Sequence, residues 1–385
     1  MAGTSRVSAP HYALPGNVYE TALERIRWVF DEFDDQVTVS ISGGKDSTVV
    51  LELALIVARE RDALPVRAQW LDQECEFEAT VDYQTWLLTE RPDEVRPQWL
   101  QIPFKLFNAT NHQDEWLHVW DPDPAVEWVR EKHPAAIHES TIGEGKLFAD
   151  ILTAINDVNG GAVLTGVRAE ESPTRRLGLT TYPSYKWVTW GQKKSKLHHV
   201  FHPIFDWSWR DIWKAIIDGN NPAEPGSDPW RYNRHYDEMY RYGIPVQKMR
   251  VSNYHHETAI SSLFYLQEIE PETWERATRR LEGISTAGQL GKDDFYVTEL
   301  PFMFRSWEEY HGYLVDNIVP DPAHQATFRK HYADLVRRLP GTDRETIAKH
   351  AVQAVIANDL YFTKGNNFYV TQRSKNKHAE RTANA

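Results

Sequence analysis

The stretch Val37-Thr38-Val39-Ser40-Ile41-Ser42-Gly43-Gly44-Lys45-Asp46-Ser47 decides the fold. Residues 36–41 are short and β-branched, as in a buried strand, and residues 48–59 have the apolar pattern of a helix. The glycine pair between them permits a tight turn and a close approach of the backbone to a ligand. A strand, a glycine turn and a helix in this order begin a βαβ unit, so the sequence predicts an α/β protein.

The alternation of strands and helices continues through the first half of the chain. Further strands are expected at 65–71, 99–103, 162–166 and 199–205, and helices at 17–33, 79–88, 147–158 and 209–217. This order predicts a doubly wound, mainly parallel sheet with helices on both faces. Ligands of such sheets bind beyond the carboxyl ends of the strands, where Ser42, Asp72 and Gly166 fall.

Changes in composition along the chain suggest its domain organisation. We expect a helical lead-in at 1–35, an α/β domain at 36–220 with an irregular insertion at 104–146, a mostly helical C-terminal domain at 221–371 and a flexible polar tail at 372–385. Helices of the second half are expected at 230–242, 257–266, 271–281, 306–315, 323–339 and 344–357.

Composition excludes several classes of protein. No apolar run reaches the roughly 18 residues that a membrane span needs, and residues 1–16 lack a secretory signal pattern, so we expect a cytoplasmic protein without a membrane segment. A single cysteine, Cys75, excludes an internal disulfide, a zinc site of several thiolates and an iron–sulfur cluster held by this chain alone. The net charge of −12 argues against general nucleic-acid binding.

The turn at 42–47 has the chemistry of an anion site. Its glycines, its serine hydroxyls and the free amides of the following helix suit a phosphate. An ordinary P-loop would need glycine in place of Val39 and serine or threonine in place of Asp46. Asp46 would repel a bare phosphate, but it fits if a magnesium ion bridges it to pyrophosphate or if it caps the helix. The candidate ligands are Ser42, Gly43, Gly44, Lys45, Asp46 and Ser47, with Asp46 as the metal ligand.

Two other strand ends carry candidate site residues. Asp72 and Glu74 follow the second strand and are candidates for binding ribose or a metal. An arginine cluster follows the strand at 162–166 and is suited to bidentate contact with phosphate, sulfate or carboxylate. Its candidate residues are Gly166, Arg168, Ser172, Arg175 and Arg176.

These motifs resemble a known family. Ser42 to Ser47 resembles the PP-loop of the ATP pyrophosphatase superfamily, whose members release pyrophosphate and often adenylate a substrate. Residues 166–175 are similar to the Gly-x-Arg-x-x-x-Ser-x-x-Arg stretch of phosphoadenosine phosphosulfate (PAPS) reductases, and residues 202–213 to a Pro-Ile-x-x-Trp-x-x-x-Asp-Ile-Trp segment that we expect to serve packing. The resemblance implies an adenine nucleotide α-hydrolase-like fold at 36–220 that binds ATP with Mg²⁺, or alternatively PAPS. It implies catalytic roles for Lys45, Asp46, Arg168 and Arg175.

The helical half resembles the C-terminal extension of the IbrA-like branch of that family, over residues 232–240, 243–251 and 271–274. Such proteins occur in bacteria, phages and mobile elements, often beside a ParB-like partner. The resemblance therefore implies a ParB-like partner and a nucleic-acid modification system. The basic, aromatic segment 182–196 is a candidate for closing over a triphosphate or contacting nucleic acid.

The sequence departs from the reductases at the thiol. The Glu-Cys-Gly-x-His-like motif that attacks sulfur is missing, and Cys75 falls in the predicted adenosine region. We therefore predict cleavage of ATP between the α- and β-phosphates to activate an unidentified acceptor. Two alternatives stay open: a PAPS reductase-like enzyme that uses a partner's thiol, and a non-catalytic module that binds a nucleotide.

Overall fold

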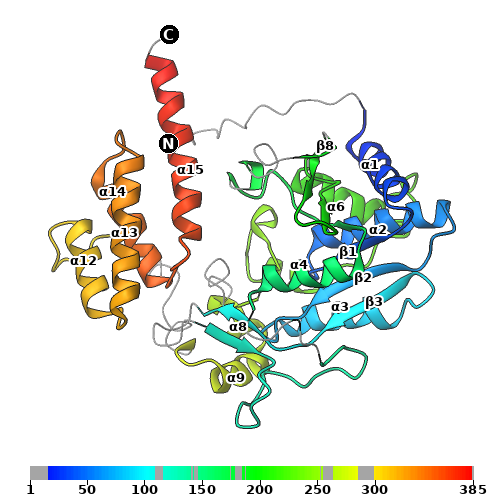
Figure 1. Ribbon diagram of the computed structural model, residues 1–385, viewed down its shortest axis with the longest axis horizontal. Coiled ribbons are helices and arrows are strands. Elements are labelled where there is room, and N and C mark those ends of the chain that lie inside the picture. The colour runs from blue at the N-terminus through cyan, green and yellow to red at the C-terminus, as the bar shows by residue number, and fades with distance from the viewer. Residues whose placement is uncertain are drawn as a thin grey trace.

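A central twisted sheet organises the computed structural model, which describes residues 16–108, 116–139, 142, 146–173, 175–177, 184–186, 188–251, 253–254, 263–284 and 299–383 (Figure 1). The strand order is β3-β2-β1-β6-β9-β8-β7. The first five strands are parallel to one another, β8 pairs antiparallel with β9, and β7 pairs antiparallel with β8. This arrangement confirms the predicted α/β class. The strands are β1 (Val37–Ser40), β2 (Val66–Leu71), β3 (Val95–Leu100), β6 (Ala162–Leu164), β7 (Ser184–Tyr185), β8 (Val188–Lys193) and β9 (His199–Phe201).

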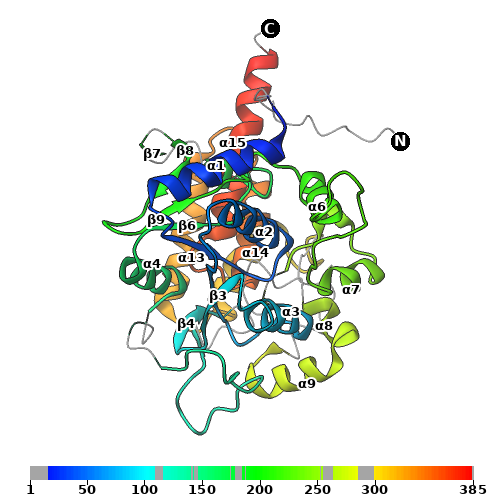
Figure 2. The ribbon, with the colours of Figure 1, turned by 90° about the vertical axis from the view of Figure 1, so that its right-hand side faces the viewer.

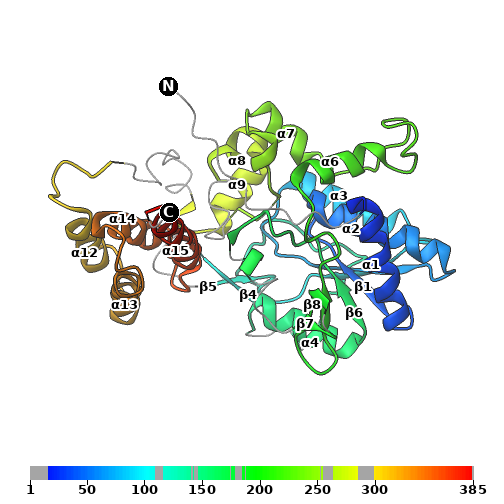
Figure 3. The same ribbon diagram turned by 90° about the horizontal axis from the view of Figure 1, so that it is seen from above.

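Helices cover both faces of this sheet (Figure 3). Alternate residues of β2 point to opposite faces: Ala68 and Trp70 join the core under α2 (Lys45–Glu60), whereas Gln69 bonds to Asn156 on α4 (Phe148–Asn159). The face of the sheet that α2 covers is also covered by α1 (Val18–Glu32), α3 (Glu78–Thr89) and α6 (Trp209–Asp218). Figure 2 shows α1 and α2 side by side in front of the strands.

Three local expectations need correction. The third strand covers Val95–Leu100 rather than 99–103, because it is an edge strand and tolerates Pro97. The insertion at 104–146 contains a hairpin, β4 (Phe104–Phe107) with β5 (Trp116–Val119), which pairs antiparallel and forms a second sheet. Helix α2 begins at Lys45 rather than 48, since Gly44 already has extended backbone geometry and caps it.

The helices after residue 221 divide into two groups. The first group packs on the α/β unit and contains α7 (His235–Arg241), a 3₁₀ turn (Val246–Lys248), α8 (Leu263–Ile269) and α9 (Pro271–Arg280). The second group lies to the side of the sheet (Figure 1) and contains α12 (Trp307–Asn317), α13 (Pro322–Arg338), α14 (Arg344–Ile356) and α15 (Thr363–Ala383). One apolar core includes Leu71 and Ile151 of the α/β unit together with Met239 and Val352, so packing crosses the predicted boundary at 221. The boundary itself stays a prediction.

The tail at 372–385 was expected to be flexible, but α15 continues through it to Ala383. Phe368 and Tyr369 at the start of this helix pack against Leu335 and Leu339 of α13, which anchors its first turns. No helix among the described residues combines the length and the apolar character needed to cross a membrane.

A cluster of buried charges fastens the insertion and α9 to the end of β2. Asp72 pairs with Arg130, and Glu74 pairs with Arg280 at 2.8 Å. Both carboxylates have fully buried side chains, and Glu74 also accepts the backbone N–H of Trp120 at 2.7 Å. Burial alone would lower the pKa of Arg280, but the Glu74 carboxylate raises it, so the guanidinium stays charged.

Replacing Arg280 by alanine leaves Glu74 buried without its guanidinium, a change that typically costs about 3–5 kcal/mol. We expect R280A to melt at a clearly lower temperature in calorimetry. The matched control R279A removes the neighbouring arginine, which is 50% exposed and pairs with Glu127 and Glu275, and should change stability by less than about 1 kcal/mol. Equal losses in the two variants would contradict the role given to the buried pair.

Glu76, two residues further, gives a prediction about pH. Burial, followed by repulsion from Asp72, raises the pKa of Glu76 from 4.5 to about 8. Between these values the folded chain holds a proton that the unfolded chain has released, so stability falls as the pH rises. Glu76→Gln cannot ionise, and its melting temperature relative to the native chain should therefore increase from pH 5 to pH 9. If the melting temperatures of the two proteins changed equally with pH, Glu76 would ionise as an ordinary glutamate does.

Candidate nucleotide site at the start of α2

The glycine turn lies at the carboxyl end of β1 and has a fixed shape. Gly43 has a φ of +72°, in the left-handed region that favours glycine, and a Cβ there would lie 2.7 Å from Thr80 Cγ2. The Ser47 hydroxyl accepts the Ser42 N–H at 3.2 Å and donates to the Gly44 carbonyl at 2.9 Å. These bonds within the turn hold its shape without a ligand.

The first turn of α2 presents backbone donors that the protein does not use. Within the described part of the chain, the N–H groups of Gly43, Gly44, Asp46 and Ser47 donate to no protein acceptor. Free amides at the positive end of a helix form a site for an anion. Ser42 is exposed, whereas Gly43 to Lys45 are buried, so the open side of the turn is at Ser42.

A segment of the helical half covers the turn. The Tyr236 hydroxyl on α7 accepts the Lys45 N–H at 2.9 Å, and the Asn233 amide donates to the Gly43 carbonyl at 3.0 Å. The Lys45 ammonium donates to the Met249 carbonyl at 3.3 Å and lies 5.4 Å from the centre of the Tyr236 ring. A phosphate that takes all the amides of the turn must therefore displace the Tyr236 hydroxyl from Lys45.

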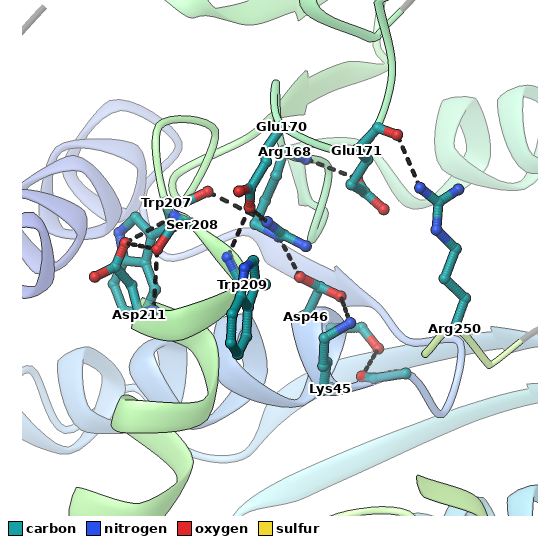
Figure 4. Close-up of polar contacts among 12 residues, drawn as sticks. Lys45, Asp46, Arg168, Glu170, Glu171, Trp207, Ser208, Trp209, Asp211 and Arg250 are labelled. Carbon is teal, nitrogen blue, oxygen red and sulfur yellow. Dashed lines mark hydrogen bonds and ion pairs between the residues drawn. The ribbon is translucent and has the colours of Figure 1, made fainter. Parts of the chain in front are cut away.

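Lys45, Asp46 and Arg168 form a row of alternating charges beside the turn (Figure 4). The Asp46 carboxylate accepts from the Lys45 ammonium at 3.1 Å and pairs with Arg168 Nε through its other oxygen. Gly166 brings the end of β6 against α2, because a Cβ at this position would lie 2.8 Å from the Ser47 nitrogen. Burial tends to lower the pKa of Arg168, but Asp46 and nearby glutamates raise it above its ordinary value.

Arg168 is held from behind by the start of α6. Its Nη1 donates to Glu170 at 2.8 Å and to the Trp207 carbonyl at 3.3 Å. Glu170 also accepts the N–H of Trp209 at 2.7 Å, next to the capping box at Ser208 (Figure 4). The segment 202–213 thus supports the site through packing and hydrogen bonds.

The remaining residues of the predicted arginine cluster lie around Glu171. Arg175 pairs with the Glu171 carboxylate and is 47% exposed, and its N–H donates to the Ser172 hydroxyl at 3.1 Å. Arg250 donates to the Glu171 carbonyl at 2.8 Å (Figure 4). Contacts of Ser172, Arg175 and Arg176 with a nucleotide stay predictions.

Asp72 and Glu74, which were expected to bind ribose or a metal, are engaged by protein groups instead. Both side chains are fully buried and serve the ion pairs described above, because the insertion and α9 close over the end of β2. We therefore do not propose them as ligands. Cys75 between them is buried too, and burial, then the Glu74 carboxylate, raise the pKa of its thiol well above the ordinary value.

The segment 182–196 is not a free loop. Its described part forms β7 and β8, and the rings of Tyr185 and Trp190 pack on Phe201 at 5.5 and 5.6 Å between centroids. Tyr182 and Trp187 lie outside the described residues. As strands of the sheet, this segment is not a loop free to close over a triphosphate, whereas its contact with nucleic acid stays a prediction.

Sequence reasoning missed the residues that cover the turn. Asn233, Tyr236 and Met249 belong to stretches noted only for their resemblance to a C-terminal extension. Tyr236 lies 191 positions from Lys45, and nothing in the sequence pairs the two. The only signal was the tyrosine-rich pattern of residues 232–240.

Comparison with known proteins supports part of this picture. Residues 105–225 match the phosphoadenosine phosphosulfate reductase domain model, and residues 243–377 match DUF3440, a domain of unknown function. The uncharacterized protein YbdN of Escherichia coli K12 is 27% identical over 326 residues, which are 80% of this chain and 77% of YbdN. An adenosine 5′-phosphosulfate reductase of Lysinibacillus sphaericus is 24% identical over 216 residues, covering 55% of this chain and 76% of the reductase.

Two solved structures are similar at low scores. A Candida auris PAPS reductase in a phosphate complex has a TM-score of 0.32 and 13% identity, over 61% of this chain and 88% of the reductase. A Candida glabrata FMN adenylyltransferase with FAD and inorganic pyrophosphate has a TM-score of 0.34 and 14% identity, over 57% of this chain and 58% of that protein. The matched part thus spans little more than half of the adenylyltransferase.

The IbrA-like branch stays a prediction, since none of these matches tests it. The domain match at 105–225 begins after the glycine turn but includes Gly166, Arg168 and the rest of the arginine cluster. Together with the reductase relatives, it supports a place for this chain in the PAPS reductase-like superfamily.

Proposed function

We propose that this chain binds ATP at residues 42–47 and cleaves it between the α- and β-phosphates. The observation that carries the proposal is the set of unused amides on Gly43, Gly44, Asp46 and Ser47 at the positive end of α2. Lys45 supplies a buried cation at the same place. The leaving pyrophosphate is the most highly charged part of the reaction, and this turn is the part of the site that suits it best.

Each residue of the charge row has a proposed role. The Lys45 ammonium leaves Asp46 and donates to phosphate oxygens instead, which neutralises charge on the departing pyrophosphate. Arg168, held by Glu170, keeps the Asp46 carboxylate directed at the turn, where it would hold Mg²⁺. The Asp46 side chain is 16% exposed and its two oxygens already accept cationic donors, so this carboxylate fits a cation. A metal held by Asp46 would act as a Lewis acid and withdraw charge from the phosphates.

The reaction is an in-line displacement at the α-phosphorus. An oxygen or nitrogen of the acceptor forms a bond to this phosphorus, and the bond from phosphorus to the bridging oxygen breaks. The electron pair leaves with pyrophosphate, and the acceptor's proton goes to solvent. The product is an adenylated acceptor, or AMP when water is the acceptor. Arg175 is proposed to stabilise the negative charge that develops on the α-phosphate.

The reductase relatives favour a second candidate, a sulfonucleotide substrate such as adenosine 5′-phosphosulfate or PAPS. Reduction would then require a thiol from another protein, because Cys75 is buried and its pKa is raised. A module that binds a nucleotide without turnover is the third candidate. The ParB-like partner, a nucleic-acid modification system and a cytoplasmic location stay predictions. The first rests on the IbrA-like resemblance, and the second rests on that resemblance together with the basic, aromatic segment 182–196.

The central prediction concerns the products. The protein with ATP, Mg²⁺ and candidate acceptors should form AMP or an adenylate together with pyrophosphate. Lys45→Ala should reduce this turnover by about 10²-fold or more, because it removes a buried cation from the leaving group. The control Lys186→Ala removes a 60% exposed lysine paired with Glu32 and should leave turnover unchanged.

Several outcomes would count against the proposal. ADP and orthophosphate as products would reject cleavage at the α-phosphorus. Tighter binding of adenosine 5′-phosphosulfate than of ATP would favour the second candidate. Nucleotide binding without any turnover would favour the third.

A further prediction tests whether the Tyr236 hydroxyl competes with phosphate for the glycine turn. Tyr236→Phe removes the hydroxyl that competes with phosphate for the Lys45 N–H, and a net hydrogen bond is worth about 1 kcal/mol, or about fivefold in affinity. We expect Y236F to bind ATP severalfold more tightly in calorimetric titrations. Tyr240→Phe on the same helix changes a 67% exposed ring and should have no effect. Weaker binding by Y236F would mean that the hydroxyl contacts the nucleotide.

A further inference from the structure

Three potential metal ligands meet on the far side of the helix that covers the turn. His235 and Glu238 lie three residues apart on α7, which places them on one face, and Glu270 directly precedes α9. Their ligand atoms all lie within 4.8 Å of one another. His235 Nδ1 is 2.9 Å from a Glu238 oxygen. The glycine turn and Asp46 take no part in this group.

The imidazole of His235 is held in place by contacts other than the one with Glu238. The side chain is fully buried, and the Phe77 ring packs on it with centroids 3.9 Å apart. Its backbone N–H donates to Asn233 Oδ1 at 2.9 Å. Within the described residues Nε2 is buried without a hydrogen-bond partner. The nitrogen that faces Glu238 is Nδ1, so an ion shared by these two side chains would bind at Nδ1.

Glu270 has the supporting contacts expected of a metal-binding carboxylate. Its two oxygens accept the N–H groups of Glu78 at 2.8 Å and Ala79 at 3.2 Å, at the start of α3. Partners of this kind orient a metal ligand while lone pairs remain for the metal.

The group opens on a cleft, which gives an ion access from solvent. The cleft has a volume of about 590 Å³, and Glu238 and Glu270 are part of its wall. The two arginines of the wall have other contacts: Arg234 pairs with Asp237 at 3.5 Å, and Arg231 lies over the Trp86 ring at 4.3 Å. The fourth coordination position would face this cleft.

We propose that His235, Glu238 and Glu270 bind one Zn²⁺ ion. Imidazole nitrogen and carboxylate oxygen are both zinc ligands, and a set that contains imidazole favours Zn²⁺ over Mg²⁺. Tetrahedral zinc with bonds of about 2.1 Å separates its ligand atoms by about 3.4 Å. To reach this geometry the Glu238 oxygen would move away from Nδ1, which it now contacts at 2.9 Å, and the more distant ligand atoms, which lie within 4.8 Å, would approach.

The ion would tie α7 to the starts of α3 and α9. Helix α7 also carries Tyr236, and Asn233 before it bonds both to the glycine turn and to His235. Zinc would therefore fix the segment that covers the nucleotide site. The zinc site itself does not depend on the proposed ATP chemistry, and its test needs no nucleotide.

The test is calorimetric titration of the full, EDTA-treated and untagged chain with ZnCl₂. We expect one saturable site, and at least a tenfold loss of affinity in Glu238→Gln, which keeps the side-chain shape but removes the ligand charge. The control Glu272→Gln changes another acid of the same cleft, outside the group, and should bind as the native chain does. Excess Mg²⁺ should not compete.

Thermal melting separates the metal site from an ordinary ion pair. Zinc should raise the melting temperature of the native chain and of E272Q, but not of E238Q. The proposal is overturned if E238Q binds zinc as tightly as the native chain, if E272Q loses as much affinity as E238Q, or if no saturable site is found. In those cases His235 and Glu238 form only a buried pair.

Discussion

The first turn of α2 presents more hydrogen-bond donors than the described part of the protein satisfies, and the candidate site is arranged around this excess. Helix geometry leaves the amides of Gly44, Asp46 and Ser47 without carbonyl partners among the described residues, as at every helix start. At α6 the side chain of Ser208 solves this problem. At α2 the residue in that position is Gly44, which has no side chain to offer. An anion is the natural complement.

Buried charge pairs bring distant segments to this region. Asp46 with Arg168 joins α2 to the segment after β6, and Glu74 with Arg280 joins the end of β2 to α9. Such pairs add little net stability compared with apolar contacts, but removing one partner is costly. They therefore act mainly to fix which segments lie together. In this way the α/β unit and the first group of C-terminal helices share one site.

Helix α7 and its neighbouring loops form part of the wall of the candidate site. Helix α7 places Tyr236 on the glycine turn with one face and brings His235 and Glu238 beside Glu270 with another. A seven-residue helix has little stability of its own, so its position depends on what it contacts. Nucleotide on one side and a metal ion on the other would therefore both act on the same short element.

The sequence by itself determined the elements that depend on local geometry. Val37 to Ser47 required a strand, a glycine turn and a helix in that order, and the later alternation required a parallel sheet, because these signals come from neighbouring residues. Pattern reasoning failed where packing outweighed composition, as in the hairpin within 104–146 and strands β7 and β8 within 182–196. Only the tertiary structure decided that Asp72 and Glu74 are buried in ion pairs, that Tyr236 covers Lys45, and that His235 meets Glu270. These contacts join residues far apart in the chain, and their partners are selected by how whole elements pack, which no local pattern records.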